Sequence, residues 1–513
     1  METSVPLSQS LIWRLQSDYY TQRGLKAWTE DLVPSYITNN PFIAEMYAGI
    51  VASFLEDCLR QVSASPISSE NPLRILELGA GTGKFSYLFL RKLMPLLPEK
   101  NIAPETVRYS MADCSEELIS QWRSNQYLAE FSRAGILEFE LLRAGEEEAP
   151  PPARQASAPL VVIANYVFDS LPQDAFVVEQ GKLSEALITV SSSGSSEKPV
   201  SLNDVQLSFA NSAVPAPRYP DPIWNAILEE YRSRLVAATV FFPSVALTLL
   251  QQLSQGSDGR MLVLAADKGF AHEEELALVR DEPALEFHSS RRCFSLMVNF
   301  HAISRCFAAT GGLALLPTKH FSNLNICAFL QRRPQDAFAE TTKAYRHAIT
   351  AFGPDDLFTV MSWLNAYLES VSVPQALSLL RLTRWDPAAF LRLFPVIAPK
   401  LRNIAAERND LRDAVLSVWK NRYPVDPGDN ALAFSCGVVL LELRFYAEAA
   451  EMFKASEQLL GQTAATSYNL GLCALGLGNR AEALTHMAEA CRLDPAFEPA
   501  QTSRARLENE ARL

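Results

Sequence analysis

The sequence predicts a doubly wound α/β sheet in the first two-thirds of the chain, followed by an all-α domain of helical repeats. From Leu73 onward, short apolar runs alternate with longer amphipathic stretches, which is the pattern of parallel strands joined by helical crossovers. Beyond about Pro334 no convincing strand pattern remains, and matched residues such as Gly437 and Gly471 recur at one fixed spacing. Such a period is typical of stacked helix pairs.

The expected strands are short apolar segments, each bounded by turn residues or by an amphipathic stretch. In chain order they are LRILEL, VRYSMAD, ILEFELL, PLVVIAN, two strands within FVVEQGKLSEALITV that turn at Gln180-Gly181, RMLVLAAD, SLMVNFHAI and NICAFLQ. Helices are expected over about Phe85–Leu97 and Leu118–Leu128. The long apolar run Leu235–Leu250 is interpreted as a buried helix that packs on the sheet.

These elements divide the chain into segments with different expected roles. They are an N-terminal helical lid (residues 1–72), the sheet domain (73–332) with a Ser- and Pro-rich insertion near 191–222, a helical linker domain (333–425) and a repeat domain (426–513). A chain of 513 residues is too long for one ordinary core. Two or three domains are therefore expected.

Composition argues against several kinds of partner. The net charge is −12, whereas a sequence-independent nucleic-acid binder needs a basic face. The run Leu235–Leu250 is interrupted by polar residues and is shorter than the roughly 20 residues of a membrane span. The eight cysteines are scattered without a C-x-x-C pair, so no metal site is predicted and reduced thiols are expected. No signal peptide is apparent, and we expect a cytoplasmic protein.

The C-terminal part contains matched positions 34 residues apart. The pairs are Gly437 and Gly471, Ala447 and Ala481, Glu448 and Glu482, Ala449 and Ala483, and Phe453 and Met487. Small residues permit two antiparallel helices to approach closely, and the larger ones fill the next layer. The period and pattern resemble the tetratricopeptide repeat, which implies a protein partner. The alternative is a chance likeness of two amphipathic hairpins. Further helical pairs are expected within residues 335–425.

The sharpest motif is a glycine-rich turn between a strand and a helix, Glu77-Leu-Gly-Ala-Gly-Thr-Gly83. Glycine permits the dihedral angles of a tight turn and leaves room for a ligand against the main chain. A dinucleotide fingerprint would need glycine at Lys84, and a phosphate-binding P-loop would need glycine at Leu78 and Ser or Thr at Phe85. Neither motif is complete.

The remaining pattern, E-x-G-x-G-x-G, resembles motif I of class I S-adenosylmethionine-dependent methyltransferases. The resemblance implies a Rossmann-like methyltransferase sheet that binds S-adenosyl-L-methionine. It assigns the cofactor to the motif residues Glu77, Gly79, Ala80, Gly81 and Gly83. It also assigns the cofactor's ribose hydroxyls to Asp113, which ends the second strand and could accept both hydroxyl protons. The alternative for Asp113 is a helix N-cap.

Several segments are similar to a narrower group, the MidA-like methyltransferases, which include the mitochondrial complex I assembly factor that acts on protein arginine. The segments are VPSYITNNPFIAEMYAGIV, NYVFDSLPQDAFVV, GRMLVLAADKGF and SLMVNFHAI. In the first of them the resemblance implies that a loop with Thr38 closes over the cofactor, and the alternative is a plain turn before Pro41. Three positions depart from the family pattern, at Tyr166, Lys268 and Asn299. Since a guanidinium needs carboxylates to orient it, the acidic residues missing at Tyr166 and Asn299 weigh against arginine.

Two polar residues follow the fourth strand, where the ligands of open α/β sheets collect. Asn165 is the candidate contact for the cofactor or the acceptor. Asp169 is the candidate carboxylate that orients the acceptor, and its alternative is a cap for the turn before Pro172. Both are the predicted catalytic residues, since methyl transfer depends chiefly on positioning. Asp267 could line the acceptor pocket or begin a turn, and His288 is given no role.

Three functions are compatible with these features. The first is a methyltransferase acting on a protein that the repeat tail presents, because repeat arrays form concave binding surfaces. The second is a methyltransferase of small molecules. The third is a cofactor-binding scaffold without activity. The intact glycine loop favours the first two, whereas the missing acidic positions favour the third.

Overall fold

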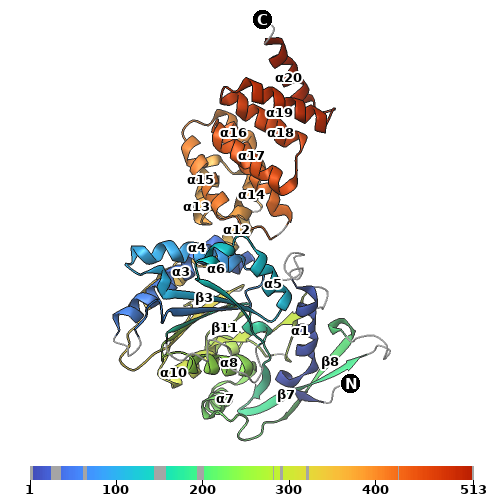
Figure 1. Ribbon diagram of the computed structural model, residues 1–513. Helices are drawn as coiled ribbons and strands as arrows, with labels where there is room; N and C mark the ends of the chain where they lie inside the picture. Colours follow the sequence, from blue (N-terminus) through green and yellow to red (C-terminus); the bar gives the residue numbers. More distant parts are fainter. Residues whose placement is uncertain are drawn as a thin grey trace. The chain divides into compact units, whose positions relative to one another are not determined.

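The computed structural model describes residues 4–24, 36–61, 66–143, 158–192, 201–280, 282–288, 293–318, 323–364, 366–425 and 427–510 (Figure 1). The chain divides into two compact units. The first comprises Met1–Asn39 and Ile43–Phe358, and the second comprises Asn40–Phe42 and Thr359–Leu513. The acidic run at residues 146–148 lies outside the described residues.

The first unit is built on a seven-stranded sheet. Its order is β15-β16-β10-β5-β2-β3-β4, with bounds β2 (Leu73–Leu78), β3 (Val107–Asp113), β4 (Leu137–Leu141), β5 (Leu160–Asn165), β10 (Met261–Asp267), β15 (Leu313–Leu315) and β16 (Asn325–Gln331). The neighbours from β4 to β10 pair in parallel. Only β16 runs antiparallel to both of its neighbours. The prediction of a doubly wound sheet is confirmed, and the strand order reverses between β2 and β5, where such sheets bind ligands.

Helices cover both faces of this sheet (Figure 1). On one face, α7 (Pro222–Arg234), α8 (Ser244–Gln255) and α10 (Phe300–Ala309) bury apolar side chains with those of β2, β5 and β10. On the other face lie α3 (Pro41–Arg60) and α4 (Lys84–Glu99). The strands therefore carry nearly continuous apolar residues, as expected where both faces are covered. The shorter helices of the unit are α1 (Leu11–Arg23), α5 (Glu116–Ser124), α6 (Ala129–Arg133), α9 (Glu273–Leu276) and α11 (Ala339–Tyr345), and α12 (Pro354–Leu364) continues into the second unit.

A second, antiparallel sheet lies beside the first. Its strands are β1 (Val5–Pro6), β6 (Asp174–Glu179), β7 (Lys182–Ser192), β8 (Val205–Ala213) and β9 (Ala237–Phe242). The predicted hairpin between β6 and β7 is confirmed, and its turn residues Gln180 and Gly181 both have positive φ angles, 47° and 77°. Within the described part of the expected insertion, β8 extends the sheet by pairing with β7.

Two predicted elements are wrong. The run Leu235–Leu250 is not one helix, because β9 occupies its first half and Pro243 separates that strand from α8. The expected strand SLMVNFHAI is also interrupted, since β14 comprises only Val298–Asn299 and α10 begins at Phe300. In both segments apolar residues lie on either side of the boundary between two elements, so periodicity alone could not divide the segment.

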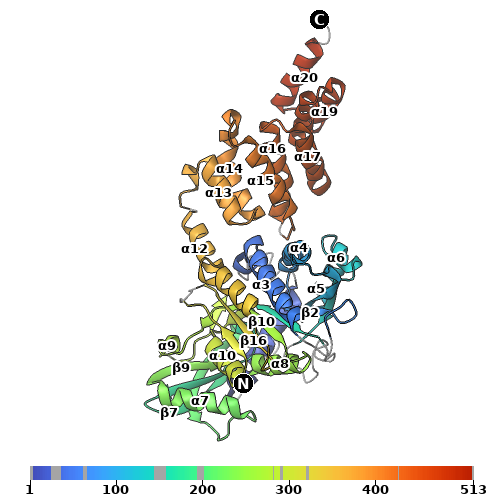
Figure 2. The same cartoon turned by 90° about the vertical axis from the view of Figure 1, so that its left-hand side faces the viewer.

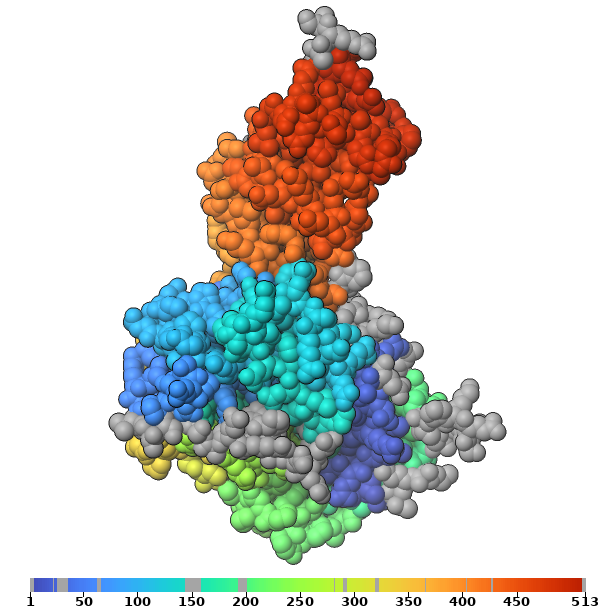
Figure 3. Space-filling view, in the orientation of Figure 1, coloured from blue at the N-terminus to red at the C-terminus, as the bar shows by residue number. Residues whose placement is uncertain are grey.

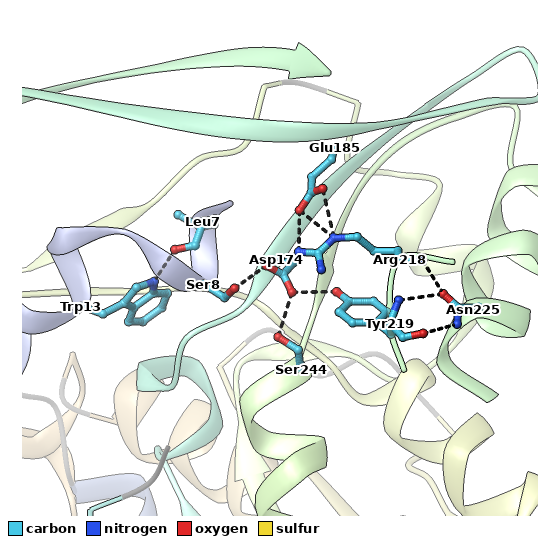
Figure 4. Close-up of polar contacts among 9 residues, drawn as sticks. All are labelled: Leu7, Ser8, Trp13, Asp174, Glu185, Arg218, Tyr219, Asn225 and Ser244. Carbon is cyan, nitrogen blue, oxygen red and sulfur yellow. Dashed lines mark hydrogen bonds and ion pairs between the residues drawn. The ribbon is translucent and has the colours of Figure 1, made fainter. Parts of the chain in front are cut away.

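A buried polar network fixes the N-terminal segment to the second sheet (Figure 4). The carboxylate of Asp174, which is 1% exposed, accepts hydrogen bonds from Ser8, from Tyr219 Oη at 2.7 Å and from Ser244 Oγ at 2.9 Å. Arg218 lies 3.4 Å from the same carboxylate and binds Glu185 with two nitrogens. Buried charges are tolerated when they are paired and hydrogen-bonded in this way. The segment that leads into α1 is thereby held in place.

Replacing Asp174 should loosen this attachment. Asp174→Ala leaves the buried donors Tyr219 and Ser244 and the half-buried Ser8 without their acceptor, so we expect the free energy of unfolding to fall by about 2 to 3 kcal/mol. The measurement is denaturant unfolding followed by circular dichroism. Asp18→Ala, which removes an exposed carboxylate from α1, should change stability by no more than about 0.5 kcal/mol. Equal effects of the two substitutions would contradict the role given to the network.

The second unit is helical (Figure 2). After the end of α12 it contains α13 (Val373–Leu382), α14 (Pro387–Ile397), α15 (Arg408–Lys420), α16 (Ala431–Glu442), α17 (Tyr446–Leu460), α18 (Ala464–Gly476), α19 (Arg480–Leu493) and α20 (Glu498–Glu510). In two consecutive helix pairs, a glycine of the first helix packs against a larger side chain of the second. A Cβ atom added to Gly437 would lie 2.8 Å from the ring of Phe453, and one added to Gly471 would lie 2.9 Å from the Met487 methyl group. The prediction of an all-helical tail is confirmed.

Adding a single methyl group at Gly437 should be destabilising. Gly437→Ala gains about 1 kcal/mol of helix propensity, but the crowding against Phe453 outweighs it, for a net loss of about 1 to 2 kcal/mol. In a Phe453→Leu background the crowding is relieved, and the same substitution should become neutral or stabilising. Thermal unfolding of the four variants measures this coupling. As a control, Gly49→Ala on α3, which meets nothing within 4 Å, should stabilise.

Among the residues that the structure describes, no helix has the length and apolarity that crossing a membrane requires. The described ranges contain no group of His, Cys, Asp and Glu side chains suited to a metal ion. All eight cysteines lie within these ranges, and none of them forms a disulfide.

Candidate functional site

A cavity of about 560 Å³ lies in the first unit, at the carboxyl ends of β2, β3 and β5. This is the position expected for a ligand site in a doubly wound sheet. Of the nine predicted site residues, eight line it, namely Thr38, Glu77, Gly79, Ala80, Gly81, Asp113, Asn165 and Asp169. The ninth, Gly83, is the N-cap residue of α4 and is not among the lining residues.

The glycine loop needs its glycines for conformational reasons. Gly79, Gly81 and Gly83 have φ angles of 63°, 52° and 77°, a region in which residues with a Cβ atom are strained. At Gly79 a Cβ atom would also lie 3.1 Å from a methyl group of Val167, which follows β5. The indole of Trp122 donates to the carbonyl oxygen of Gly81 at 2.9 Å. The main chain of this loop is therefore held in one conformation beside the cavity.

Glu77 lies at the floor of the cavity and is 4% exposed. Its Oε2 accepts hydrogen bonds from Ser86 and from Tyr109 Oη, the latter at 2.6 Å. Burial raises the pKa of Glu77 to about 7, although the two hydrogen bonds act in the opposite direction. Because only one oxygen of the carboxylate is engaged by these partners, the group can still attract a cation in the cavity.

Asp113 connects the ends of two neighbouring strands. Its Oδ2 accepts from the main-chain N–H of Gly81 at 3.1 Å, and its Oδ1 accepts from that of Cys114 at 2.8 Å. The N-cap of α5 is Ser115, whose side chain accepts from Leu118, so the alternative interpretation of Asp113 as an N-cap is wrong. Burial raises its pKa. Each carboxylate oxygen retains a lone pair that a ligand hydroxyl could use.

Thr38 and Asn39 line the cavity from a short 3-10 turn, Tyr36–Thr38. The segment is a turn before Pro41 that borders the cavity, and its closure over a cofactor stays a prediction. The amide nitrogen of Asn39 donates to Thr82 Oγ1 at 3.4 Å. Asn39 Oδ1 is buried and has no hydrogen-bond partner among the described residues, so an acceptor for a ligand N–H group is present.

The side chains around the loop discriminate between possible ligands. Glu77, Asp113 and Asn39 Oδ1 are all hydrogen-bond acceptors, and two of them carry a carboxylate. A phosphate group would be repelled here, whereas a ligand with a positive charge and hydroxyl groups would be stabilised. These residues therefore fit the sulfonium, ammonium and ribose groups of S-adenosyl-L-methionine.

Asn165 and Tyr166 lie where β5 ends. Asn165 Oδ1 accepts from Tyr47 Oη at 3.0 Å, and Tyr47 is fully buried on α3. This bond fixes the orientation of the Asn165 amide beside the cavity. Tyr166, which stands where the MidA-like pattern has glutamate, has a φ angle of 53°. A non-glycine residue in this region is held there by its surroundings, and such residues cluster at functional sites.

The carboxyl groups of Asp169 and Asp267 form a buried pair beside the cavity. The main-chain N–H of Asp169 donates to Asp267 Oδ2 at 3.1 Å, and Asp169 Oδ1 accepts from Ser170 Oγ at 2.9 Å. Burial and the nearby charge of Asp169 raise the pKa of Asp267 well above its ordinary value, and burial raises the pKa of Asp169 to about 6. The two carboxyl groups therefore titrate as one coupled pair, with both pKa values raised. Asp169 lines the cavity and Asp267 does not.

Of the three departures from the MidA-like pattern, two concern the site. Tyr166 and Lys268 line the cavity, and Lys268 Nζ lies 2.9 Å from Glu286. Asn299 is not among the lining residues. Its amide nitrogen donates to the carbonyl oxygen of Phe241, and its Oδ1 accepts from Ala302 as the N-cap of α10. The substitution at Asn299 therefore concerns helix capping, and it says nothing about the acceptor.

Sequence reasoning missed one wall of the cavity. It consists of Trp13, Gln16, Ser17 and Tyr20 from α1, together with His288, Cys293, Phe294 and Ser295 from the hairpin of β12 (Glu286–His288) and β13 (Cys293–Ser295). The α1 residues are spaced i, i+3, i+4 and i+7, so they share one helix face. The opposite face of α1 forms part of the molecular surface (Figure 3). The only sequence signal for this wall was the spacing of polar and aromatic residues along one face of α1.

Comparison with known proteins finds a similar family for residues 50–300. Residues 50–300 match the model of a family described as "Putative S-adenosyl-L-methionine-dependent methyltransferase". Residues 50–300 are similar to this methyltransferase family. No curated protein matches the chain.

Two solved structures from Burkholderia thailandensis are similar. One is a COG1565 superfamily member bound to S-adenosyl-homocysteine, with 17% identity and a TM-score of 0.44. The other is a native crystal structure of a COG1565 superfamily protein, with 16% identity and a TM-score of 0.41. Each likeness covers 66% of this chain and 90% of the other chain.

Cofactor affinity should depend on the protonation of Glu77. Ionised Glu77 attracts a cation, and with a pKa of about 7 the ionised fraction falls from about nine-tenths at pH 8 to about one-tenth at pH 6. We expect the affinity for S-adenosyl-L-methionine to fall by up to about tenfold over this interval. Calorimetric titration at several pH values measures the slope.

The control for this prediction is Glu77→Gln, which keeps the shape of the side chain but cannot ionise. The effect of pH on the ligand's own ionisable groups is the same for the parent and for the variant. The variant should therefore bind more weakly than the parent at pH 8 and show a flatter profile. Parallel profiles for the parent and the variant would contradict the assignment of the titrating group to Glu77.

Proposed function

We propose that this protein transfers a methyl group from S-adenosyl-L-methionine to an acceptor bound in the same cavity. The observation that carries the proposal is the continuity of that cavity. Its lining runs from the glycine loop and Asp113 to Asn165, Asp169 and the α1 wall. A group-transfer enzyme must hold donor and acceptor within reach of each other, and a single cavity with both kinds of lining supports this arrangement.

The cofactor would supply an activated methyl group on its sulfonium. The chain's own residues would do the positioning. The main chain of Gly79, Ala80 and Gly81 would lie against the cofactor, Glu77 and Asn39 would face its cationic groups, and Asp113 would accept from its ribose hydroxyls. Asn165, held by Tyr47, would orient the reacting groups. Asp169 would accept a proton from the acceptor, because it is a buried carboxylate that is mostly ionised at neutral pH.

We infer that the acceptor is a side chain of a protein, which the helical tail recruits. Support comes from the consecutive helix pairs α16–α17 and α18–α19, in each of which glycine packs against a larger residue 16 positions later. That packing is compatible with tetratricopeptide-type repeats, whose surfaces bind peptides and helices. The second candidate is a small molecule. The aromatic side chains of Trp13, Phe294 and Tyr166 on the cavity wall favour it.

Blocking the glycine loop should abolish cofactor binding. In Gly81→Arg a long side chain would fill the proposed cofactor site, so we expect calorimetry with S-adenosyl-L-methionine to show at least a hundredfold loss of affinity. The matched control is Gly181→Arg in the exposed β6–β7 turn. It imposes similar strain, since Gly181 also has a positive φ angle, but it lies outside the cavity lining.

The two variants separate a local effect from a general one. Binding by the parent and by Gly181→Arg, with loss only in a folded Gly81→Arg, would support the proposed site. Absence of binding by the parent at millimolar cofactor would reject both enzymatic functions. It would then favour a scaffold that acts through protein contacts.

A further inference from the structure

The part of the cavity wall that α1 forms contains a buried hydrogen-bond donor without a partner among the described residues. Gln16 lines the cavity and is 3% exposed. Its Oε1 accepts from the main-chain N–H of Phe294 at 2.8 Å, which fixes the orientation of the amide, because an amide nitrogen could not accept this bond. Gln16 Nε2 has no partner within the part of the chain that the structure describes. A buried donor left unpaired is costly, so a ligand acceptor is the natural partner.

Gln16 and Asp169 are attached to the same extended segment. Phe294 N–H binds Gln16, and two residues later Leu296 N–H donates to the main-chain oxygen of Asp169 at 3.1 Å. Two residues of extended chain span about 7 Å. Gln16 and Asp169 are therefore attached to neighbouring positions of one segment, and both line the same cavity.

An aromatic surface lies next to this donor. Trp13 and Phe294 pack with their ring centroids 4.8 Å apart, and both line the cavity. The indole of Trp13 donates to the carbonyl oxygen of Leu7 at 2.8 Å, so the ring is held in one orientation by the anchored N-terminal segment. A flat group would bury its face against this pair.

The charged and polar groups that line the cavity near Gln16 disfavour a cationic acceptor. Lys268 and Asp169 both line the cavity, and Asp169 lies beside a second buried carboxyl group, that of Asp267. A guanidinium group has five donors and no acceptor, so it would leave Gln16 Nε2 unpaired and would lie near a second cation. A carboxylate acceptor could not donate to Asp169 and would be repelled by it. An uncharged planar group with a carbonyl oxygen and an N–H group matches both partners.

We propose that the methyl acceptor is a carboxamide, whose carbonyl oxygen accepts a hydrogen bond from Gln16 Nε2 while its N–H group donates to Asp169. This inference rests on the proposed methyltransferase function and names the acceptor class of the same cavity. In the reaction the amide nitrogen forms a bond to the methyl carbon as the bond from that carbon to sulfur breaks. The nitrogen passes one proton to Asp169, and the donor leaves as the neutral thioether.

Binding of two nearly isosteric probes tests the proposal without knowledge of the natural acceptor. Benzamide carries a carboxamide on a flat ring, whereas benzamidine replaces the carbonyl oxygen with a nitrogen and is a cation. The full-length protein saturated with S-adenosyl-homocysteine is titrated with each probe by ligand-observed NMR. We expect benzamide to bind at least tenfold more tightly than benzamidine.

The variant Gln16→Glu supplies the reverse test. A carboxylate still accepts the Phe294 N–H bond, but it has no donor and it attracts an amidinium. The preference should therefore invert in favour of benzamidine. Gln9→Glu, at an exposed position outside the cavity lining, adds the same charge and should leave the preference unchanged. Unfolding temperatures and the affinity for S-adenosyl-homocysteine show whether each variant is folded and loaded.

The outcomes separate this inference from the function on which it rests. Failure to bind S-adenosyl-homocysteine overturns the proposed function. Normal binding of S-adenosyl-homocysteine with a preference for benzamidine, with no probe binding at all, or with no inversion in Gln16→Glu overturns the carboxamide proposal alone. A third probe, N-acetylglutamine methylamide, distinguishes the source of the amide. Tighter binding of this probe than of benzamide indicates a protein side chain, and weaker binding indicates a free aromatic amide.

Discussion

The site depends on one hydrogen bond, from the main-chain N–H of Gly81 to the carboxylate of Asp113. It connects the loop after β2 to the end of β3, so the two strands deliver their polar groups to one place. The loop can donate this bond only because Gly79, Gly81 and Gly83 adopt positive φ angles. Glu77 then lies below the loop, and the helix that follows starts at Lys84. The half of the cavity that is proposed to bind the cofactor thus depends on the backbone conformation of this loop.

Much of this half could be predicted from the sequence, because its residues are contiguous. A strand, a glycine turn and a helix follow one another between Leu73 and Glu99, and the spacing of glycines is meaningful within such a short segment. Asp113 and Asn165 could be predicted from the sequence for a similar reason. Each ends an apolar strand, and the carboxyl ends of parallel strands meet at one edge of the sheet.

The acceptor half could not be predicted in this way. The contact between Gln16 and Phe294 joins residues 278 positions apart, and it follows from how α1 is tied to the second sheet. Trp13, Gln16 and Tyr20 look from their spacing like an ordinary helix face, and nothing local shows that the face borders a cavity. The role of Asn299 was misjudged for the same reason. A missing acidic residue has a different meaning when the position caps a helix and when it faces a ligand.

The attachment of α1 also has a consequence for how the protein can be handled. The wall that carries Gln16 belongs to a segment that precedes the sheet domain in sequence, and this segment is attached through the pairing of β1 with β7 and through Ser8. A shortened chain that starts after Gly24 would keep the glycine loop and the whole seven-stranded sheet. It would nevertheless lose one side of the acceptor chamber. Such a protein could bind its cofactor normally and still reject every acceptor, so cofactor binding alone is a poor guide to an intact enzyme.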